Sequence, residues 1–371
     1  MNQFAKWIHE YEDWPHFSWD KTILSPLLEE VYLKQQILFD KMGTIGFDIH
    51  RTVSLKILTE DIIKSSAIEE KTLNKDEVRS SLARRLGLKY DSNVFVGREV
   101  EGFAEMMLDA IWKYSKPLTK QRLCDWHSAL FPTGKSGIHT IRVGDWRQED
   151  AGPMQVVSGP LGYEKVHFEA PPANRVPSEM ETFLQWFNAD LEIDPLVKAG
   201  IAHFWFVTLH PFEDGNGRIA RAVCDMALAK ADKMPERFYS LSSQFEAERN
   251  DYYNQLEIQQ RSTTDLTSWL SWFLACFARA LDSSGKKLQT VLQSHCVWKE
   301  MDSGDVNERQ KIIVSKMLED DFKGFINSSK YAKLAKCSTD TALRDIHDLM
   351  QKGVLVKNPS GGRSSSYRLE Q

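Results

Sequence analysis

Residues 210–221 read HPFEDGNGRIAR, and they combine a histidine, an aspartate, two glycines around an asparagine, and two arginines. Apolar residues at helical spacing lie on both sides, so we predict a loop that leads into the N-terminus of a helix. Gly215 and Gly217 let the backbone approach a ligand closely, and the free N–H groups at the start of a helix attract anions. Together these features predict a loop that binds phosphate.

The charged and titratable side chains of this loop suit a nucleotide bound with a metal ion. Arg218 and Arg221 lie three positions apart at the start of the predicted helix, so both guanidinium groups face the same anion. Asp214 offers the kind of oxygen that Mg²⁺ binds when phosphates supply the other ligands. His210 can accept a proton near neutral pH. We therefore expect His210 to be catalytic and Asp214 to be a metal ligand.

The same stretch resembles the signature of the Fic family, His-x-Phe-x-(Asp/Glu)-Gly-Asn-Gly-Arg-x-x-Arg, and every fixed position is filled. The resemblance implies a mainly α-helical core with a β-hairpin flap. It also implies transfer of AMP from ATP, with Mg²⁺, to a Ser, Thr or Tyr hydroxyl of a protein target, with His210 removing the proton of that hydroxyl. The residues implied to bind the phosphates are Gly215, Asn216 (backbone and side chain), Gly217, Arg218 and Arg221.

A second Fic-like feature lies at residues 65–70, which read SSAIEE. Ser65 and Glu69 are four positions apart, so on a helix they share one face. The stretch resembles the family's inhibitory motif, (Ser/Thr)-x-x-x-Glu-(Gly/Asn), which in one class precedes the catalytic loop in the same chain. The resemblance implies that Glu69 pairs with Arg221 and keeps the γ-phosphate of ATP from binding productively. Glu70 departs from the Gly or Asn of the motif.

Two adjacent tyrosines, Tyr252 and Tyr253, lie on a helix predicted over residues 243–256. Tyrosines at helical spacing are mostly part of a protein core. Fic sequences place an aromatic or polar residue beside the adenine near this position, and we choose Tyr252 for that contact.

Apolar and polar residues alternate between Gly137 and Pro172, and GPLG at 159–162 interrupts them. This pattern predicts a β-hairpin with its turn near residues 158–163. The resemblance implies a flap over the active site that aligns the target segment by strand addition. A purely structural hairpin is the alternative.

Changes in composition along the chain predict four regions. An aromatic-rich segment at residues 1–20 is expected to pack as a cap on the larger domain. The expected regions are an N-terminal helical module at 1–60, a Fic domain at 61–282 with its inhibitory helix near 61–72, a linker helix at 283–304, and a domain at 305–371.

The pattern of residues 305–371 predicts three short helices followed by a hairpin that turns at Gly361 and Gly362. This order of elements resembles a winged helix-turn-helix. From residue 323 onward nine Lys or Arg stand against four Asp or Glu, which favours DNA. Three aspartates on the expected outward face of the reading helix oppose phosphate binding: Asp340, Asp345 and Asp348. DNA binding and a role in packing or dimerisation therefore both stay open.

The composition of the 371-residue chain is ordinary for a globular protein, with a net charge of −5 that gives no general reason to bind nucleic acid or membranes. The five cysteines have no metal or redox spacing, and the N-terminus does not resemble a signal peptide. We therefore expect a cytoplasmic protein without a membrane segment.

The function that these features predict is a protein adenylyltransferase that uses ATP and Mg²⁺ and is inhibited by Glu69. The target is another protein or the chain itself, for which Ser364, Ser365, Ser366 and Tyr367 lie in a stretch expected to be flexible. Two alternatives stay open, an ATP-sensing transcription regulator that binds DNA and removal of AMP at the same site. A homodimer that controls Glu69 also stays open.

Overall fold

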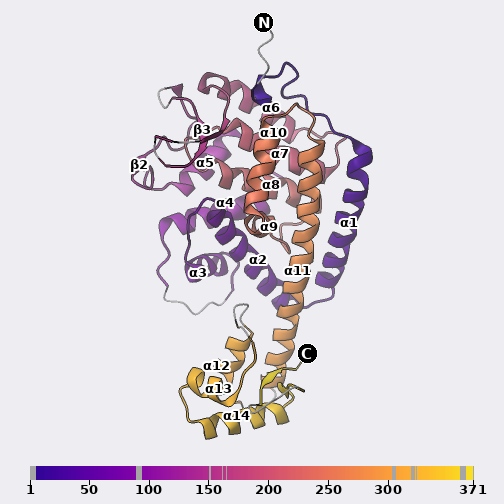
Figure 1. Ribbon diagram of the computed structural model, residues 1–371, viewed down its shortest axis with the longest axis vertical. Coiled ribbons are helices and arrows are strands. Elements are labelled where there is room, and N and C mark those ends of the chain that lie inside the picture. Colours follow the sequence, from indigo (N-terminus) through magenta and orange to yellow (C-terminus); the bar gives the residue numbers. More distant parts are fainter. Residues whose placement is uncertain are drawn as a thin grey trace. The chain divides into compact units, whose positions relative to one another are not determined.

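The computed structural model describes residues 6–88, 94–149, 152–160, 162–163, 165–302, 306–318, 322, 324–359 and 365–370. The chain forms two compact units, Met1–Ser284 and Gly285–Gln371 (Figure 1). None of the described helices combines the length and the apolar character that a membrane span requires.

The first unit is mainly helical, as the sequence predicted. Two short 3₁₀ turns, Ile8–Glu10 and Ala173–Arg175, accompany its α-helices. The α-helices are α1 (Lys21–Gly43), α2 (Phe47–Ile68), α3 (Lys75–Arg85), α4 (Arg98–Trp112), α5 (Lys120–Leu130), α6 (Val176–Asn188), α7 (Pro195–Leu209), α8 (Asn216–Asp232), α9 (Leu241–Ala247), α10 (Arg249–Gln260) and α11 (Thr267–Asp302), which continues into the second unit. The boundary predicted at residue 60 falls inside α2.

Helix α7 is the centre of this unit because it is apolar on every side, and such a helix is stable only when neighbours cover all its faces. Its start is specified locally. The carboxylate of Asp194 accepts hydrogen bonds from the N–H groups of Leu196 and Val197, at 2.9 and 3.4 Å. Pro195 occupies the first helical position, where its missing N–H is no loss. Helix α8 packs along α7, so the loop between them is held from both sides.

The aromatic N-terminal segment packs as the expected cap. Trp7 and Trp14 are buried. The ring of Trp7 meets the edge of Phe168 with a centroid separation of 5.3 Å, and Trp14 meets Trp205 of α7 at 6.3 Å. The N-terminal segment therefore covers α7 on one side and supports a β-hairpin on the other.

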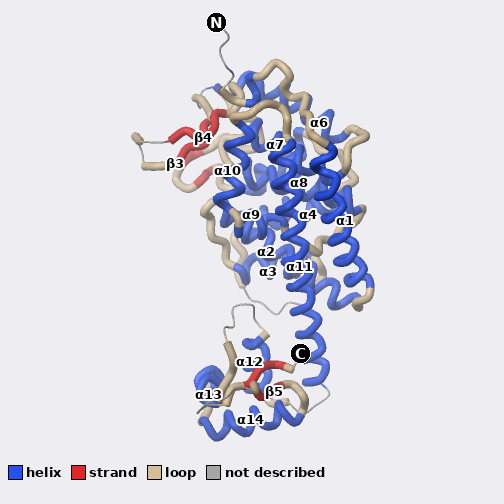
Figure 2. Tube along the Cα trace, turned by 45° about the vertical axis from the view of Figure 1, so that its right-hand side comes forward, coloured by secondary structure: helices blue, strands red, loops and turns tan. Residues whose placement is uncertain are grey.

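That hairpin consists of β3 (Gln155–Ser158) and β4 (Lys165–Glu169), paired antiparallel with Ser158 opposite Lys165, which confirms the predicted hairpin (Figure 2). Two hydrogen bonds of 2.6 Å join Ser158 to His167 and His167 to Glu257, and so attach it to α10. A smaller pair, β1 (Lys135–Ser136) and β2 (His139–Thr140), precedes it.

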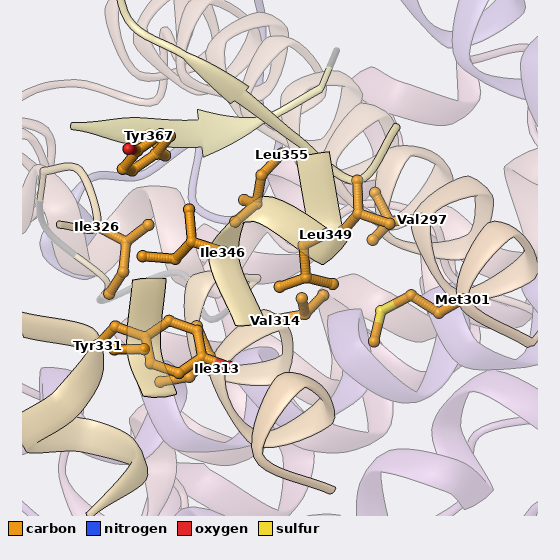
Figure 3. Close-up of a cluster of buried hydrophobic side chains, with 12 residues drawn as sticks. Val297, Met301, Ile313, Val314, Ile326, Tyr331, Ile346, Leu349, Leu355 and Tyr367 are labelled. Carbon is orange, nitrogen blue, oxygen red and sulfur yellow. The ribbon is translucent and has the colours of Figure 1, made fainter. Parts of the chain in front are cut away.

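The second unit contains the expected three helices and a strand pair. They are α12 (Glu308–Met317), α13 (Ser328–Ala335), α14 (Thr339–Gln351), β5 (Leu355–Lys357) and β6 (Tyr367–Leu369). Side chains of all these elements and of the end of α11 form one apolar core (Figure 3). The predicted turn glycines and Ser364 lie outside the described residues. Tyr367 is buried in this core, which contradicts its placement in a flexible stretch.

Asp345 does not lie on an outward face, and that expectation was wrong. Its side chain is only 6% exposed. Its carboxylate accepts hydrogen bonds from Arg309 at 3.0 Å, from Asn307 at 3.0 Å and from the hydroxyl of Tyr331 at 3.1 Å. These partners supply the polar contacts that a buried carboxylate requires.

Candidate active site

The loop between α7 and α8 has a left-handed residue at each end. His210 ends α7 with φ of 49°, and Gly215 precedes α8 with φ of 81°. Glycine is required at the second of these positions for a further reason, because a Cβ atom there would lie 2.9 Å from the ring of Phe131. Phe212 is fully buried between them, as expected, and stacks on His127 with a centroid separation of 4.2 Å.

Asn216 holds the loop in this shape. Its carboxamide oxygen accepts the N–H of Phe212 at 2.9 Å, and its nitrogen donates to the carbonyl of Phe212 at 2.8 Å. We expected this side chain to contact phosphate, but its oxygen and its nitrogen are both already hydrogen-bonded to the backbone of Phe212. What remains for a ligand is the backbone, where the first N–H groups of α8 lack acceptors within the helix.

Arg147 is a residue of this site that sequence reasoning missed. It is 3% exposed, and its guanidinium donates to the carbonyl of His210 at 2.7 Å and to that of Pro171. Its own N–H donates to the carbonyl of Pro211 at 2.9 Å. Burial lowers the pKa of Arg147 to about 10, which leaves it charged at neutral pH. It ties the catalytic loop to the base of the hairpin.

His127 supports the other half of the loop and was also missed. Its Nδ1 accepts the N–H of Gly144 at 3.1 Å, so Nε2 carries the proton and donates to the carbonyl of Asp214 at 3.1 Å. Burial lowers the pKa of His127 to about 4, and the ring is neutral at physiological pH.

His210 is placed as a proton acceptor. Its Nδ1 lies 3.0 Å from the carbonyl of Val207. A carbonyl only accepts hydrogen bonds, so Nδ1 carries the proton and the lone pair of the neutral ring is on Nε2. Burial lowers the pKa of His210 below its ordinary value of 6.5, although the hydrogen bond to Val207 opposes the shift. The imidazole is therefore uncharged at neutral pH, and the lone pair on Nε2 can accept a proton.

The two arginines of the loop are buried with unused donors. Arg221 is 1% exposed. It donates from Nε to the hydroxyl of Ser65 at 2.8 Å and from Nη2 to the carboxylate of Glu69 at 3.0 Å, but its Nη1 has no partner among the described residues. In the same part of the chain, Nε and Nη2 of Arg218 also lack hydrogen bonds, although Nη2 lies 3.9 Å from Asp214. These buried donors without acceptors are available to an anionic ligand.

Glu69 lies over the start of α8. A Cβ atom on Gly217 would collide with the Glu69 carboxylate, so glycine is required there for the carboxylate to fit. The position is favourable for negative charge because the N-terminus of α8 and Arg221 both face it. The predicted proximity of Ser65, Glu69 and Arg221 is thus present in the structure.

The end of α2 has the geometry of a Schellman motif. Glu70 is left-handed with φ of 59°, its N–H donates to the carbonyl of Ala67 at 3.0 Å, and the N–H of Lys71 donates to that of Ser66 at 3.0 Å. Gly and Asn adopt this conformation most readily, which explains their place in the family motif. Glu70 forms an ion pair with Arg249 at 2.9 Å.

Asp214 is surrounded by donors. Its carboxylate accepts the N–H of Gly215 at 2.5 Å and the hydroxyl of Ser136, and the ammonium of Lys71 lies 3.5 Å away. Burial acts to raise the pKa of Asp214, but these hydrogen bonds and nearby cations hold it below its ordinary value. The described residues contain no cluster of three His, Cys, Asp or Glu that would hold a metal alone. A single carboxylate suits Mg²⁺ that is also bound by phosphates.

Tyr252, the residue chosen for the adenine contact, lies inside the core, and that contact stays a prediction. It is 1% exposed, its hydroxyl is hydrogen-bonded to Nε2 of the buried His203 at 2.9 Å, and its ring stacks on Phe245. Tyr253, its neighbour, is partly exposed and donates to the carbonyl of Ile68 at 3.0 Å. Helical spacing alone does not distinguish the two positions.

Comparison with known proteins agrees with this geometry. Residues 117–228 match the Fic/DOC family, and residues 7–88 match a domain of unknown function, DUF4172. The chain therefore contains a Fic/DOC family domain that follows an N-terminal DUF4172 module. This module extends through α2 and α3, and therefore includes the segment that carries Glu69.

Two curated relatives are similar over part of the chain. Protein adenylyltransferase fic-1 of Caenorhabditis elegans is 24% identical over 193 residues, which are 50% of this chain and 35% of that protein. Protein adenylyltransferase Fic of Nematostella vectensis is 25% identical over 230 residues, 60% of this chain and 48% of that protein. The chain thus spans less than half the length of these relatives.

A solved Fic family protein from Desulfovibrio desulfuricans G20 covers 94% of this chain and 96% of its own, with a TM-score of 0.54 and 20% identity. At this identity the likeness shows a shared fold.

Proposed function

We propose that this protein is an adenylyltransferase that transfers AMP from ATP to a hydroxyl group of a protein. The observation that carries the proposal is the convergence of three features at one loop. They are the free Nε2 of His210, the unpaired buried donors of Arg218 and Arg221, and the N-terminus of α8. The similarity to two relatives named protein adenylyltransferase supports the same activity.

In this mechanism Nε2 of His210 removes the proton of the target hydroxyl as its oxygen attacks the α-phosphorus. The bond to pyrophosphate breaks, and Arg218 stabilises the charge that develops on the leaving group. Arg221 binds the γ-phosphate. Arg147 holds the carbonyl of His210 and so positions the base. Asp214 would hold Mg²⁺, which when bound neutralises phosphate charge.

The proposed function includes inhibition by Glu69. The contact that supports it is the ion pair of Glu69 with Arg221, the residue that we propose binds the γ-phosphate, because Glu69 uses the Nη2 donor of that arginine. A carboxylate and a phosphate cannot share this place because both are anions. These contacts support an inhibitory role for Glu69 and a supporting role for Ser65, which accepts a hydrogen bond from Nε of Arg221.

The test is intact-protein mass spectrometry of the wild type and of Glu69→Gly, each incubated with ATP and Mg²⁺ together with a protein extract. The variant should transfer AMP faster than the wild type. Adding His210→Ala should reduce transfer by ~10²–10⁴, the usual contribution of a general base. Equal transfer with and without His210 would refute its role. Faster loss of AMP from a modified protein with Glu69 present would favour removal of AMP instead.

We also propose that the second unit binds duplex DNA. Of the three aspartates expected to oppose phosphate binding, Asp345 is buried and Asp348 is paired with Lys352 at 2.6 Å. Only the charge of Asp340 then opposes binding. The exposed residues of α13, α14 and the turn between them include the bases Lys333, Lys336, Arg344 and His347. This local charge favours a phosphate backbone although the whole chain is acidic.

Fluorescence anisotropy with labelled duplex DNA at several salt concentrations tests this second function. Binding should weaken with salt, and Arg344→Glu should weaken it further and reduce the salt slope by about one. Lys311→Glu is the matched control, because Lys311 is already paired with Glu308. Absence of binding at low salt would leave packing or dimerisation as the role of this unit.

A further inference from the structure

Lys71 lies against Asp214, the carboxylate that we propose holds the metal ion. Its ammonium is 3.5 Å from Oδ2 of Asp214 and lies over the ring of Phe131, 5.3 Å from the centroid. The mechanism above gives Lys71 no role. Yet it follows Glu69 by only two residues, and Glu69 contacts the arginine of the same loop.

The backbone explains why both side chains reach the loop. The Schellman motif ends α2 at Glu69 and reverses the chain through the left-handed Glu70. Lys71 is fixed in this motif by its own N–H, which donates to the carbonyl of Ser66. A local hydrogen-bonded turn therefore sets the separation of the two charges, rather than the flexibility of a loop.

The two charges match the loop in order and in sign. The negative Glu69 meets the positive Arg221, and the positive Lys71 meets the negative Asp214. A nucleotide with its metal ion presents the same pair, an anion for the arginine and a cation for the aspartate. An ammonium is a monovalent substitute for that cation, as a carboxylate is for the phosphate.

We propose that residues 69–71 are a two-charge plug in which Lys71 competes with the metal ion for Asp214 while Glu69 competes with phosphate for Arg221. This rests on the proposed function, since it assigns the regulation of the same site. Its consequence is that the metal and the nucleotide displace the segment together. Removal of either charge weakens the plug.

The expected effect of Lys71 is modest. The side chains of Lys71 and Asp214 are 40% and 36% exposed, so water screens their attraction. Pairs of this kind contribute about 0.2–1 kcal/mol. Loss of the ammonium should therefore lower the Mg²⁺ concentration needed for half-maximal nucleotide binding by about 1.5- to 5-fold.

The experiment measures binding of a non-hydrolysable ATP analogue by calorimetry during a Mg²⁺ titration. Lys71→Met removes the charge and keeps most of the apolar stem, and it should shift the titration to lower Mg²⁺. Lys71→Arg retains the charge and should stay near the wild type. Lys64→Met is the matched control, because the Lys64 side chain on α2 is as exposed as that of Lys71 but pairs with Glu246 at 3.0 Å. It should leave the titration unchanged.

The outcomes separate this inference from the proposed function. If Lys71→Met and Lys64→Met give the same Mg²⁺ dependence as the wild type, Lys71 does not compete with the metal, and the inference fails while nucleotide binding stands. If no variant binds the nucleotide at any Mg²⁺ concentration, the proposed function fails as well. If Lys71→Met shifts the Mg²⁺ titration by the same factor in the Glu69→Gly background, the two charges act independently. That result would overturn the inference that they form one plug.

Discussion

Replacing Glu70 by glycine should tighten the inhibition that we propose for Glu69. Glu70 is left-handed with φ of 59°, a conformation that costs a residue with a Cβ atom roughly 1 kcal/mol more than glycine. The substitution also removes the ion pair with Arg249, but the Glu70 side chain is 77% exposed, and such pairs contribute about 0–1 kcal/mol. The net gain of about 0.5 kcal/mol should stabilise the end of α2 with Glu69 on Arg221. Basal AMP transfer should fall by about two-fold.

The assay compares basal AMP transfer and the free energy of unfolding in three variants. Glu70→Ala removes the ion pair but keeps the Cβ atom, so the difference between Ala and Gly isolates the backbone term of about 1 kcal/mol. Lys233→Gly is the matched control, because Lys233 is also left-handed at the end of a helix, with φ of 54°, and does not belong to the inhibitory segment. It should gain stability without a change in activity. Equal stability of the Ala and Gly variants, or faster transfer by the Gly variant, would refute the reasoning.

Three further predictions concern the catalytic loop. Gly217→Ala should displace Glu69 but also lower AMP transfer and nucleotide affinity, because its methyl group enters the space that Glu69 and the phosphates are proposed to share; unchanged nucleotide affinity by calorimetry would contradict this. Arg147→Met should lower kcat and leave KM nearly unchanged. It should also reduce the free energy of unfolding by about 1–3 kcal/mol, because the buried carbonyls of His210 and Pro171 lose their hydrogen-bond donor. In the Glu69→Gly background, the acid limb of the pH–rate profile should lie below pH 6.5, because burial lowers the pKa of His210 and only the neutral ring accepts a proton; a limb above 6.5 would exclude His210 as the base.

Much of the site could be predicted from the sequence because its chemistry is concentrated in a short stretch. Residues 210–221 combine a histidine, an aspartate, two glycines and two arginines, and this combination predicts a loop that binds phosphate. The contacts of Arg221 with Ser65 and Glu69 agree with the predicted pairing. Surface helices such as α4 and α14 were also predictable from apolar spacing, whereas α7 is apolar on every side and shows no amphipathic pattern.

The supporting residues could not be predicted in this way. Arg147 and His127 act on backbone carbonyls 63 and 87 positions away, and a carbonyl carries no sequence signal. Asp345 was placed outside because charged residues usually are, but Arg309 and Tyr331 supply partners from other helices. Tyr252 and Tyr253 differ in burial only through the direction in which α10 faces its neighbours. Each of these placements depends on contacts between distant segments.

The clamp that Asn216 makes on Phe212 has a consequence for the energetics of ligand binding. A flexible phosphate loop loses about 1–2 kcal/mol of conformational entropy for each residue that it orders around a nucleotide. Here the turn is already closed by two hydrogen bonds within the protein. A nucleotide would therefore meet a turn that is already ordered. If Glu69 inhibits as proposed, the free energy of activation is concentrated in the displacement of a few side chains at the end of α2, and small changes in that segment alone set the threshold.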